Sequence, residues 1–299
     1  MLQNYENGIA FTDDTYWPVE EAKISLLDWG LLRSDANQDT ISVWNGAFFR
    51  LEDHLDRFDR NIRKLRLECP YRRDEQRAVL TECVRRTRFR DAYVQMLMTR
   101  GRPPIGVRDI RQCVHKFHIF CLPYMWLAPE EVRQRGLHAK ISHTQRVPPE
   151  TVDPTIKHYH WLDFQMGLFQ AYDAGADTVI LIDRDGNVAE GPGFNVFVVK
   201  DGRLATPATG VLDGMTRRTV IELCGEMNIE CVLEPISPSK VYETDEVFLT
   251  STAGGVIAVT MVDGRPIGDG KPGPITNQLN ASYWSKREAG WYAIPIDYD

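Results

Sequence analysis

Three turn dipeptides, each set between runs of β-branched and aromatic residues, determine what kind of fold this chain can adopt. They are Asn45-Gly46, Asp185-Gly186 and Asp201-Gly202. Such pairs favour the tight turn of a β-hairpin because both residues accept a positive φ. We therefore expect antiparallel strands around position 45 and two successive hairpins over residues 178–207.

Amphipathic helices are predicted between these hairpins. Apolar residues recur at spacings of three and four over residues 51–65, and Pro70 follows as a stop. Further helices are expected over 75–86, from Trp161 to Tyr172 and from Gly214 onward, and further strands over 92–99, 114–122 and 247–250. This mixture predicts an α/β (α+β) protein with a smaller N-terminal domain (1–121), a linker (122–135) and a larger C-terminal domain (136–299).

The composition is that of an ordinary folded protein. Among 299 residues, 43% are hydrophobic and 26% are charged. The net charge is −7, and the Lys and Arg residues are interspersed with acids, so the sequence has no basic stripe of the kind that binds nucleic acid. The six cysteines are scattered without a CxxC pair, which favours reduced thiols and a cytoplasmic location. Residues 1–14 do not resemble a secretory signal, and no apolar run predicts a membrane span.

Lys157 is the first candidate for chemistry. It precedes an amphipathic helix and has apolar and aromatic neighbours. Burial there would disfavour the ammonium form and leave a nucleophilic amine. A solvated lysine at a helix start is the common alternative.

Glycine-rich turns supply further candidates. Glu190 precedes Gly-Pro-Gly, where the backbone could approach a planar ring closely. Gly214-Met215-Thr216 at a helix start could bind a phosphate through free N–H groups, or simply cap the helix. The turn at 251–255 (Ser-Thr-Ala-Gly-Gly) could bind a phosphate or carboxylate, or be a plain hydroxyl turn.

Several side chains remain open to two interpretations. Arg57 could reach a phosphate or pair with Asp53 on its helix. Tyr93 and Gln95 share one face of a predicted strand and could line a pocket or face solvent. The loop over 101–112 is long enough to be a binding loop. His158 and His160 lack a matching acid or cysteine cluster, so we predict no metal site.

Together these segments closely resemble the class IV aminotransferases, the family of branched-chain and D-amino acid aminotransferases. The resemblance rests on Lys157 and on the segments HLDRF (54–58), EGPGFNVFVVKDGRLATP (190–207), GVLDGMTRRTV (210–220) and STAGG (251–255). It covers about Ser25 to Gly255.

This resemblance implies a two-domain fold type IV enzyme with pyridoxal 5'-phosphate between the domains, and a homodimer or a larger assembly. It implies Lys157 as the Schiff-base lysine and proton shuttle, and Glu190 at the pyridine nitrogen. Other cofactor contacts are implied for Arg57, Asn195, Met215, Thr216, Ser251 and Thr252.

Three segments look most like the (R)-selective amine transaminases: LLRSD (31–35), TRGRPPIGVRD (99–109) and LPYMWLAPEE (122–131). In that group the loop arginine, here Arg108, can swing in to hold a keto-acid carboxylate. The sequence departs from the subgroup at Gln38 and Gln95, where two amides would favour a polar or carboxylated substrate. The expected substrate contacts are Arg33, Gln38, Tyr93, Gln95, Arg108, Trp161 and Ala253.

The predicted function is therefore transfer of an amino group from an amine or amino acid, (R)- or D-configured, to a keto acid such as pyruvate. Three alternatives stay open. They are a branched-chain or D-amino acid aminotransferase, a lyase similar to aminodeoxychorismate lyase, and a non-catalytic protein that binds pyridoxal phosphate.

Overall fold

The computed structural model describes residue 5 and residues 7–299. The first residues of the chain, on which the expectation of no secretory signal rests in part, lie largely outside this range. The chain divides into two compact units. Unit 1 comprises Met1–Met125, Ile156–Tyr159 and Arg287–Asp299, and unit 2 comprises Trp126–Thr155 and His160–Lys286. The main division thus falls inside the segment predicted as a linker, while residues 156–159 and 287–299 lie in unit 1.

Unit 1 is built on a seven-stranded antiparallel sheet. Its strands, in sheet order, are β16 (Ala293–Pro295), β4 (Ala47–Phe49), β3 (Ala36–Trp44), β5 (Ala92–Arg102), β6 (Val114–Pro123), β1 (Ile9–Thr12) and β2 (Thr15–Pro18). Its helices are α1 (Trp29–Arg33), α2 (Leu51–Lys64) and α3 (Arg73–Thr87), with a 3-10 turn η1 (Ile110–Gln112).

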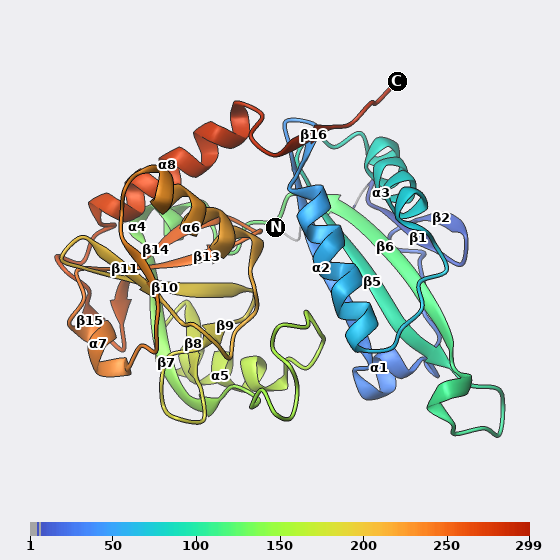
Figure 1. The fold of residues 1–299 in the computed structure, drawn as a ribbon, viewed down its shortest axis with the longest axis horizontal. Helices are drawn as coiled ribbons and strands as arrows, with labels where there is room; N and C mark the ends of the chain where they lie inside the picture. Colours follow the sequence, from blue (N-terminus) through green and yellow to red (C-terminus); the bar gives the residue numbers. More distant parts are fainter. Residues whose placement is uncertain (1–4, 6) are drawn as a thin grey trace. The chain divides into compact units, whose positions relative to one another are not determined.

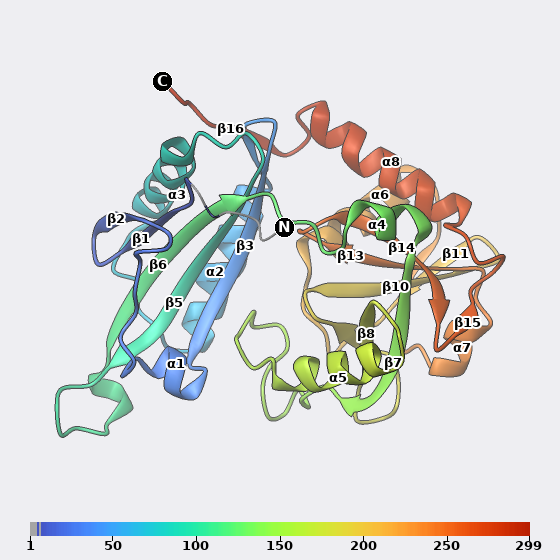
Figure 2. The same ribbon diagram turned by 180° about the vertical axis from the view of Figure 1, so that it is seen from behind.

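The two faces of this sheet differ in chemistry. Helices α2 and α3 cover one face (Figure 1), where Leu55 and Phe58 pack against strand residues such as Ile41 and Met96 in a single apolar core. Figure 2 shows the opposite face along β3, β5 and β6. Since side chains alternate along a strand, that face carries the polar partners of the same strands, Gln38 and Gln95 among them.

Unit 2 contains a nine-stranded mixed sheet. Its main path runs β12 (Cys231–Leu233), β11 (Arg203–Thr206), β10 (Phe194–Lys200), β13 (Glu246–Ser251), β14 (Gly255–Val262), β7 (Leu137–Gln145) and β8 (Thr178–Ile182), while β9 (Glu190–Gly191) pairs with β10 and β15 (Arg265–Pro266) with β14. Its helices are α4 (Glu130–Arg135), α5 (Leu162–Asp173), α6 (Met215–Glu226), α7 (Pro238–Tyr242) and α8 (Pro274–Glu288), of which the last two residues belong to unit 1.

Helices pack on this second sheet through short apolar contacts. In α5, Phe164 and Ala171 pack against Val179 and Leu181 of β8, and α6 packs against β13 (Figure 1). Tyr172, predicted to belong to the apolar face of α5, is 57% exposed, so that face ends earlier than expected.

The two units confirm the predicted α/β class. One local expectation is corrected at Gly101, which was predicted to begin an irregular loop. Strand β5 continues to Arg102 because Gly101 adopts φ +66° at an irregularity in the pairing with β6. A Cβ at this position would lie 1.7 Å from the carbonyl oxygen of Val114, so only glycine fits. No helix in the described part of the chain is both long and apolar enough to span a membrane.

Candidate active site

The backbone of Lys157 is held within unit 1. The N–H of Gln38 in β3 donates to the carbonyl of Lys157 at 2.8 Å. With its amide oriented to satisfy both of its polar atoms, Asn61 of α2 accepts from the N–H of Lys157 at 3.1 Å and donates to the carbonyl of Arg57 at 3.3 Å. The lysine predicted for catalysis is therefore tied to the same strand and helix that carry Gln38 and Arg57.

Arg57 is buried and forms an ion pair. Its Nε and Nη2 donate to the two carboxylate oxygens of Asp39 at 2.8 and 2.7 Å, and His54 Nδ1 lies 2.8 Å from the same carboxylate. Burial alone would raise the pKa of Asp39, but the charges and hydrogen bonds of Arg57 and His54 hold it below its usual range. The sequence left open a surface pair between Arg57 and Asp53. The structure instead shows a buried pair with Asp39, and its two hydrogen bonds fix the plane of the guanidinium.

Five polar side chains form a connected network on the face of the sheet away from α2. Thr40 donates to the Gln38 amide oxygen at 3.3 Å and lies 3.3 Å from the Tyr93 hydroxyl. Tyr93 donates to Gln95 Oε1 at 3.1 Å, and Gln95 Nε2 donates to the Tyr159 hydroxyl. Burial raises the pKa of both phenols, so they stay neutral. The structure therefore joins three predicted substrate residues to a tyrosine two positions after Lys157.

Two predicted substrate residues of unit 1 lie outside this network. Arg33 is exposed and stacks over the Trp29 ring, with 4.0 Å between the guanidinium carbon and the ring centroid. Arg108 is exposed in the loop between β5 and β6 and forms no hydrogen bond or ion pair with the described residues. Its guanidinium is thus available to an anion from solvent.

In unit 2, Glu190 is a buried carboxylate with two kinds of donor. Arg146 Nε donates to its Oε1 at 3.1 Å, and the N–H of Leu212 donates to its Oε2 at 2.9 Å. Arg146 also donates to Asp163 at 2.6 Å and lies over the Phe164 ring. A carboxylate oriented in this way can face a protonated ring nitrogen. The alternative of a solvated glutamate is excluded, since Glu190 is only 4% exposed.

The start of α6 is open to an anion. Its cap residue is Gly214, which has no side chain to accept from the first-turn N–H groups of Met215 and Thr216. A Cβ at Gly214 would lie 2.1 Å from Asn195 Oδ1, so any larger residue would have to displace the Asn195 side chain. Asn195 in turn donates to the Leu212 carbonyl at 3.0 Å. An uncapped helix start with close backbone approach suits a phosphate.

The turn after β13 contains the remaining predicted contacts. Ser251 donates to the Gly193 carbonyl at 2.9 Å and accepts from the N–H of Ala253, so its hydroxyl orders the turn. Thr252 and Ala253 are half-buried. Trp161, also half-buried, caps α5 and packs edge-on against Phe164.

These observations meet the requirements of pyridoxal phosphate within each unit. Unit 1 offers a lysine amine and a buried, oriented guanidinium, and unit 2 offers a buried carboxylate and an uncapped helix start at Gly214. The amine is the nucleophile that an aldehyde needs, and the other groups match a phosphate and a pyridinium nitrogen.

Sequence reasoning missed four residues of this arrangement: Asp39, His54, Arg146 and Tyr159. Asp39 carried a usable signal, because it alternates with the apolar Ile41 and Val43 on the core side of a strand, where a carboxylate must be paired. The other three carried none, since their partners lie 15 to 64 positions away.

Several known proteins are similar to this chain over most of its length. The model of the family Amino-transferase class IV matches residues 38–262. A "Putative branched-chain-amino-acid aminotransferase" of Methanocaldococcus jannaschii is 35% identical over 284 residues, which cover 94% of this chain and 95% of that protein. A "D-alanine aminotransferase" of Bacillus licheniformis is 30% identical, with 88% and 91% covered. The crystal structure of the T.th. branched-chain amino acid aminotransferase with pyridoxamine 5'-phosphate superposes with a TM-score of 0.90 at 28% identity, covering 97% of this chain and 99% of that one.

Proposed function

This chain belongs to the class IV aminotransferases, which use pyridoxal phosphate, and from that premise we propose that it moves an amino group from an amino acid to a keto acid with the cofactor held on Lys157. The buried polar network from Gln38 to Tyr159 is the observation that carries the substrate class. It favours a carboxylated substrate over a purely apolar amine.

In this proposal each residue has a defined task. The Nζ of Lys157 removes the proton from the α carbon of the donor and returns it on the cofactor side. Arg57 and the start of α6 bind the phosphate, and Glu190, oriented by Arg146, keeps the ring nitrogen protonated. When bound, pyridoxal phosphate supplies the carbon that accepts the amino group and a ring that withdraws electrons.

The network supports recognition of a carboxylate by neutral donors. Tyr93 and Tyr159 keep their protons because burial raises the pKa of both, and Gln38 and Gln95 add amide groups. An apolar aryl group offers no hydrogen-bonding partner to the donors of this network that its internal bonds leave over, and each donor buried without a partner costs about 1–3 kcal/mol. Donors related to those named for the relatives, branched-chain amino acids and D-alanine, fit this chemistry.

A second candidate is transfer from an (R)-amine to pyruvate. Its support is Arg108, which is exposed on the loop between β5 and β6 and could hold the acceptor carboxylate in one half-reaction and withdraw in the other. The two candidates differ in the donor and share the remaining chemistry.

A half-reaction screen tests the proposal. The purified holoenzyme is mixed with L-leucine, D-alanine, (R)-1-phenylethylamine or (S)-1-phenylethylamine without a keto acid, and the loss of cofactor absorbance is recorded. We expect amino acids to react at least about tenfold faster than either phenylethylamine. Faster reaction of (R)-1-phenylethylamine would favour the second candidate.

The same samples address the remaining alternatives. With D-serine, which has a leaving group on its β carbon, added as a fifth donor, a lyase would turn over repeatedly without a keto acid, whereas an aminotransferase stops after one equivalent. A non-catalytic binding protein would react with none of the donors. The homodimer, the cytoplasmic location and the position of the cofactor between the domains remain predictions, of which the first is measured by light scattering on the purified chain.

A further inference from the structure

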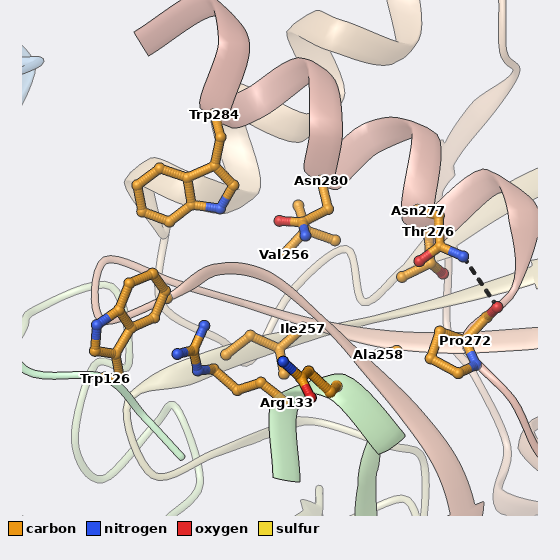
Figure 3. A pocket seen from close by; sticks show the side chains of 12 residues that line it. Trp126, Arg133, Val256, Ile257, Ala258, Pro272, Thr276, Asn277, Asn280 and Trp284 are labelled. Carbon is orange, nitrogen blue, oxygen red and sulfur yellow. Dashed lines mark hydrogen bonds between the residues drawn. The ribbon is translucent and has the colours of Figure 1, made fainter. Parts of the chain in front are cut away.

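Unit 2 contains a cavity of about 250 Å³ between α4, α8 and β14. Figure 3 shows Trp284 and Asn280 of α8 on one side of it, and Trp126 and Arg133 on the other. None of these four residues belongs to the cofactor and substrate contacts proposed above. The volume lies below the roughly 300–1,000 Å³ of sites for drug-sized molecules, so the cavity suits a small ligand.

Arg133 places a positive charge at this cavity. Its guanidinium stacks over the Trp126 ring, with 3.7 Å from the guanidinium carbon to the ring centroid, and its Nε donates to the Ala128 carbonyl at 3.1 Å. Within the described chain no carboxylate lies within ion-pair distance of this half-buried arginine. Its two terminal nitrogens have the geometry that binds a carboxylate through two hydrogen bonds.

Asn280 places an unsatisfied acceptor at the same cavity. Its Oδ1 is buried and has no hydrogen-bond partner among the described residues. Buried polar atoms in proteins are almost always paired, with protein groups, ordered water or a ligand, so this oxygen can accept a hydrogen bond from a molecule in the cavity. The missing partner is a donor, an ammonium or a hydroxyl.

The rest of the lining is apolar. The rings of Trp126 and Trp284 lie 5.4 Å apart between centroids at an angle of 41°, and Val256 and Ile257 of β14 complete the wall. This surface suits an aliphatic or aromatic side chain a few atoms long.

We propose that this cavity is a second binding site, for a free α-amino acid with an apolar side chain. Its carboxylate binds Arg133, its ammonium donates to Asn280 Oδ1, and its side chain packs against the two indoles. A plain carboxylic acid would leave Asn280 unsatisfied, and a plain amine would leave Arg133 unpaired. The site does not depend on the proposed catalytic function.

The site also adjoins the turn that carries Thr252 and Ala253. Gly254 of this turn lines the cavity, and the N–H of Leu127, next to Trp126, donates to the Ala253 carbonyl at 2.6 Å. An amino acid bound there contacts the segments on both sides of this hydrogen bond.

Calorimetry on the borohydride-treated holoenzyme tests the proposal, because reduction prevents amines from reacting at Lys157. The titrants are L-leucine, 4-methylpentanoic acid and 3-methylbutylamine. We expect a leucine site that binds at least about tenfold more tightly than the same site binds either analogue. Arg133→Gln and Asn280→Leu should each weaken it by a similar factor, while Arg135→Gln, the same charge change on α4 outside the cavity lining, should not.

A crystal structure of the protein grown with L-leucine supplies the second readout, with density expected between Trp126 and Trp284. Equal leucine binding by the native protein and Arg133→Gln, together with no density in the cavity, would overturn the proposal. Equal binding of leucine and 4-methylpentanoic acid at this site would overturn the amino acid as its ligand. Half-reaction rates of the untreated native enzyme report the catalytic proposal separately, so failure of one leaves the other measurable.

Discussion

Asp39→Asn removes the charge that orients Arg57. The carboxylate accepts two hydrogen bonds from Arg57 at 2.7–2.8 Å and lies 2.8 Å from His54, with all three side chains at most 2% exposed. Removing one partner of a buried ion pair costs about 3–5 kcal/mol. Since asparagine keeps one acceptor oxygen, we expect the lower end, about 3 kcal/mol of unfolding free energy.

The same substitution should weaken cofactor binding. An arginine without its two-point anchor samples other orientations, and a charge-assisted contact to phosphate contributes about 1.5–3 kcal/mol, so the Kd for pyridoxal phosphate should rise about tenfold or more. Urea unfolding of the cofactor-free chain and a fluorescence titration with pyridoxal phosphate measure the two effects.

Asp56→Asn is the matched control, because it makes the same change on α2 at a carboxylate that is 69% exposed and paired with Arg73. Exposed pairs contribute about 0–1 kcal/mol, so stability and cofactor affinity should both stay near native. Near-native stability and near-native cofactor affinity of Asp39→Asn, as in this control, would refute the proposed role of the buried ion pair.

Three further outcomes are expected. Arg57→Ala should raise the Kd for pyridoxal phosphate more than Thr216→Ala, since it removes a charge-assisted contact of about 1.5–3 kcal/mol, whereas Thr216→Ala keeps the backbone N–H groups that supply the helix-start contribution of about 0.3–2 kcal/mol; a larger effect of Thr216→Ala in the same titration would reverse this ranking. Gln95→Leu breaks the link between Tyr93 and Tyr159 and should raise KM for amino acid donors about tenfold while leaving KM for 1-phenylethylamine near the native value. An equal rise in KM for both kinds of donor in steady-state assays would argue against a role of the network in substrate binding. Burial lowers the pKa of His54, so the folded state resists its protonation and unfolding free energy should fall as pH drops below about 6.5; His54→Gln should reduce this fall in urea unfolding at pH 8 and pH 5.5, and an unchanged pH dependence would contradict it.

Local signals in the sequence predicted much of the fold. The Asn45-Gly46 turn joins β3 and β4, the apolar stripe over 51–65 forms α2, and Gly214 begins α6, each as expected. These features depend on neighbouring residues, whose turn chemistry and periodicity are readable without the fold.

Other elements had no local signature. Strand β7 pairs in parallel with β14 and β8, and α8 buries residues such as Leu279 and Tyr283 that no simple stripe announced. Whether these segments form strands or helices is decided by tertiary packing, which overrides local propensity.

The candidate site shows the same division. Glycine turns pointed to Glu190 and Met215, because close backbone approach leaves a mark in the sequence. The partners that orient these groups could not be predicted. Arg146 is 44 positions from Glu190, and Tyr159 is 64 positions from Gln95, so only the folded chain brings them together.

Covalent attachment of the cofactor to Lys157 is the central claim, and mass spectrometry of peptides tests it most directly. The holoenzyme is treated with borohydride and digested, and the peptide that contains Lys157 is examined. The account predicts that this peptide gains the mass of one reduced cofactor, and that Lys157→Ala neither shows this label nor turns over. An unlabelled Lys157 peptide from fully loaded enzyme, or attachment at another lysine, would contradict it.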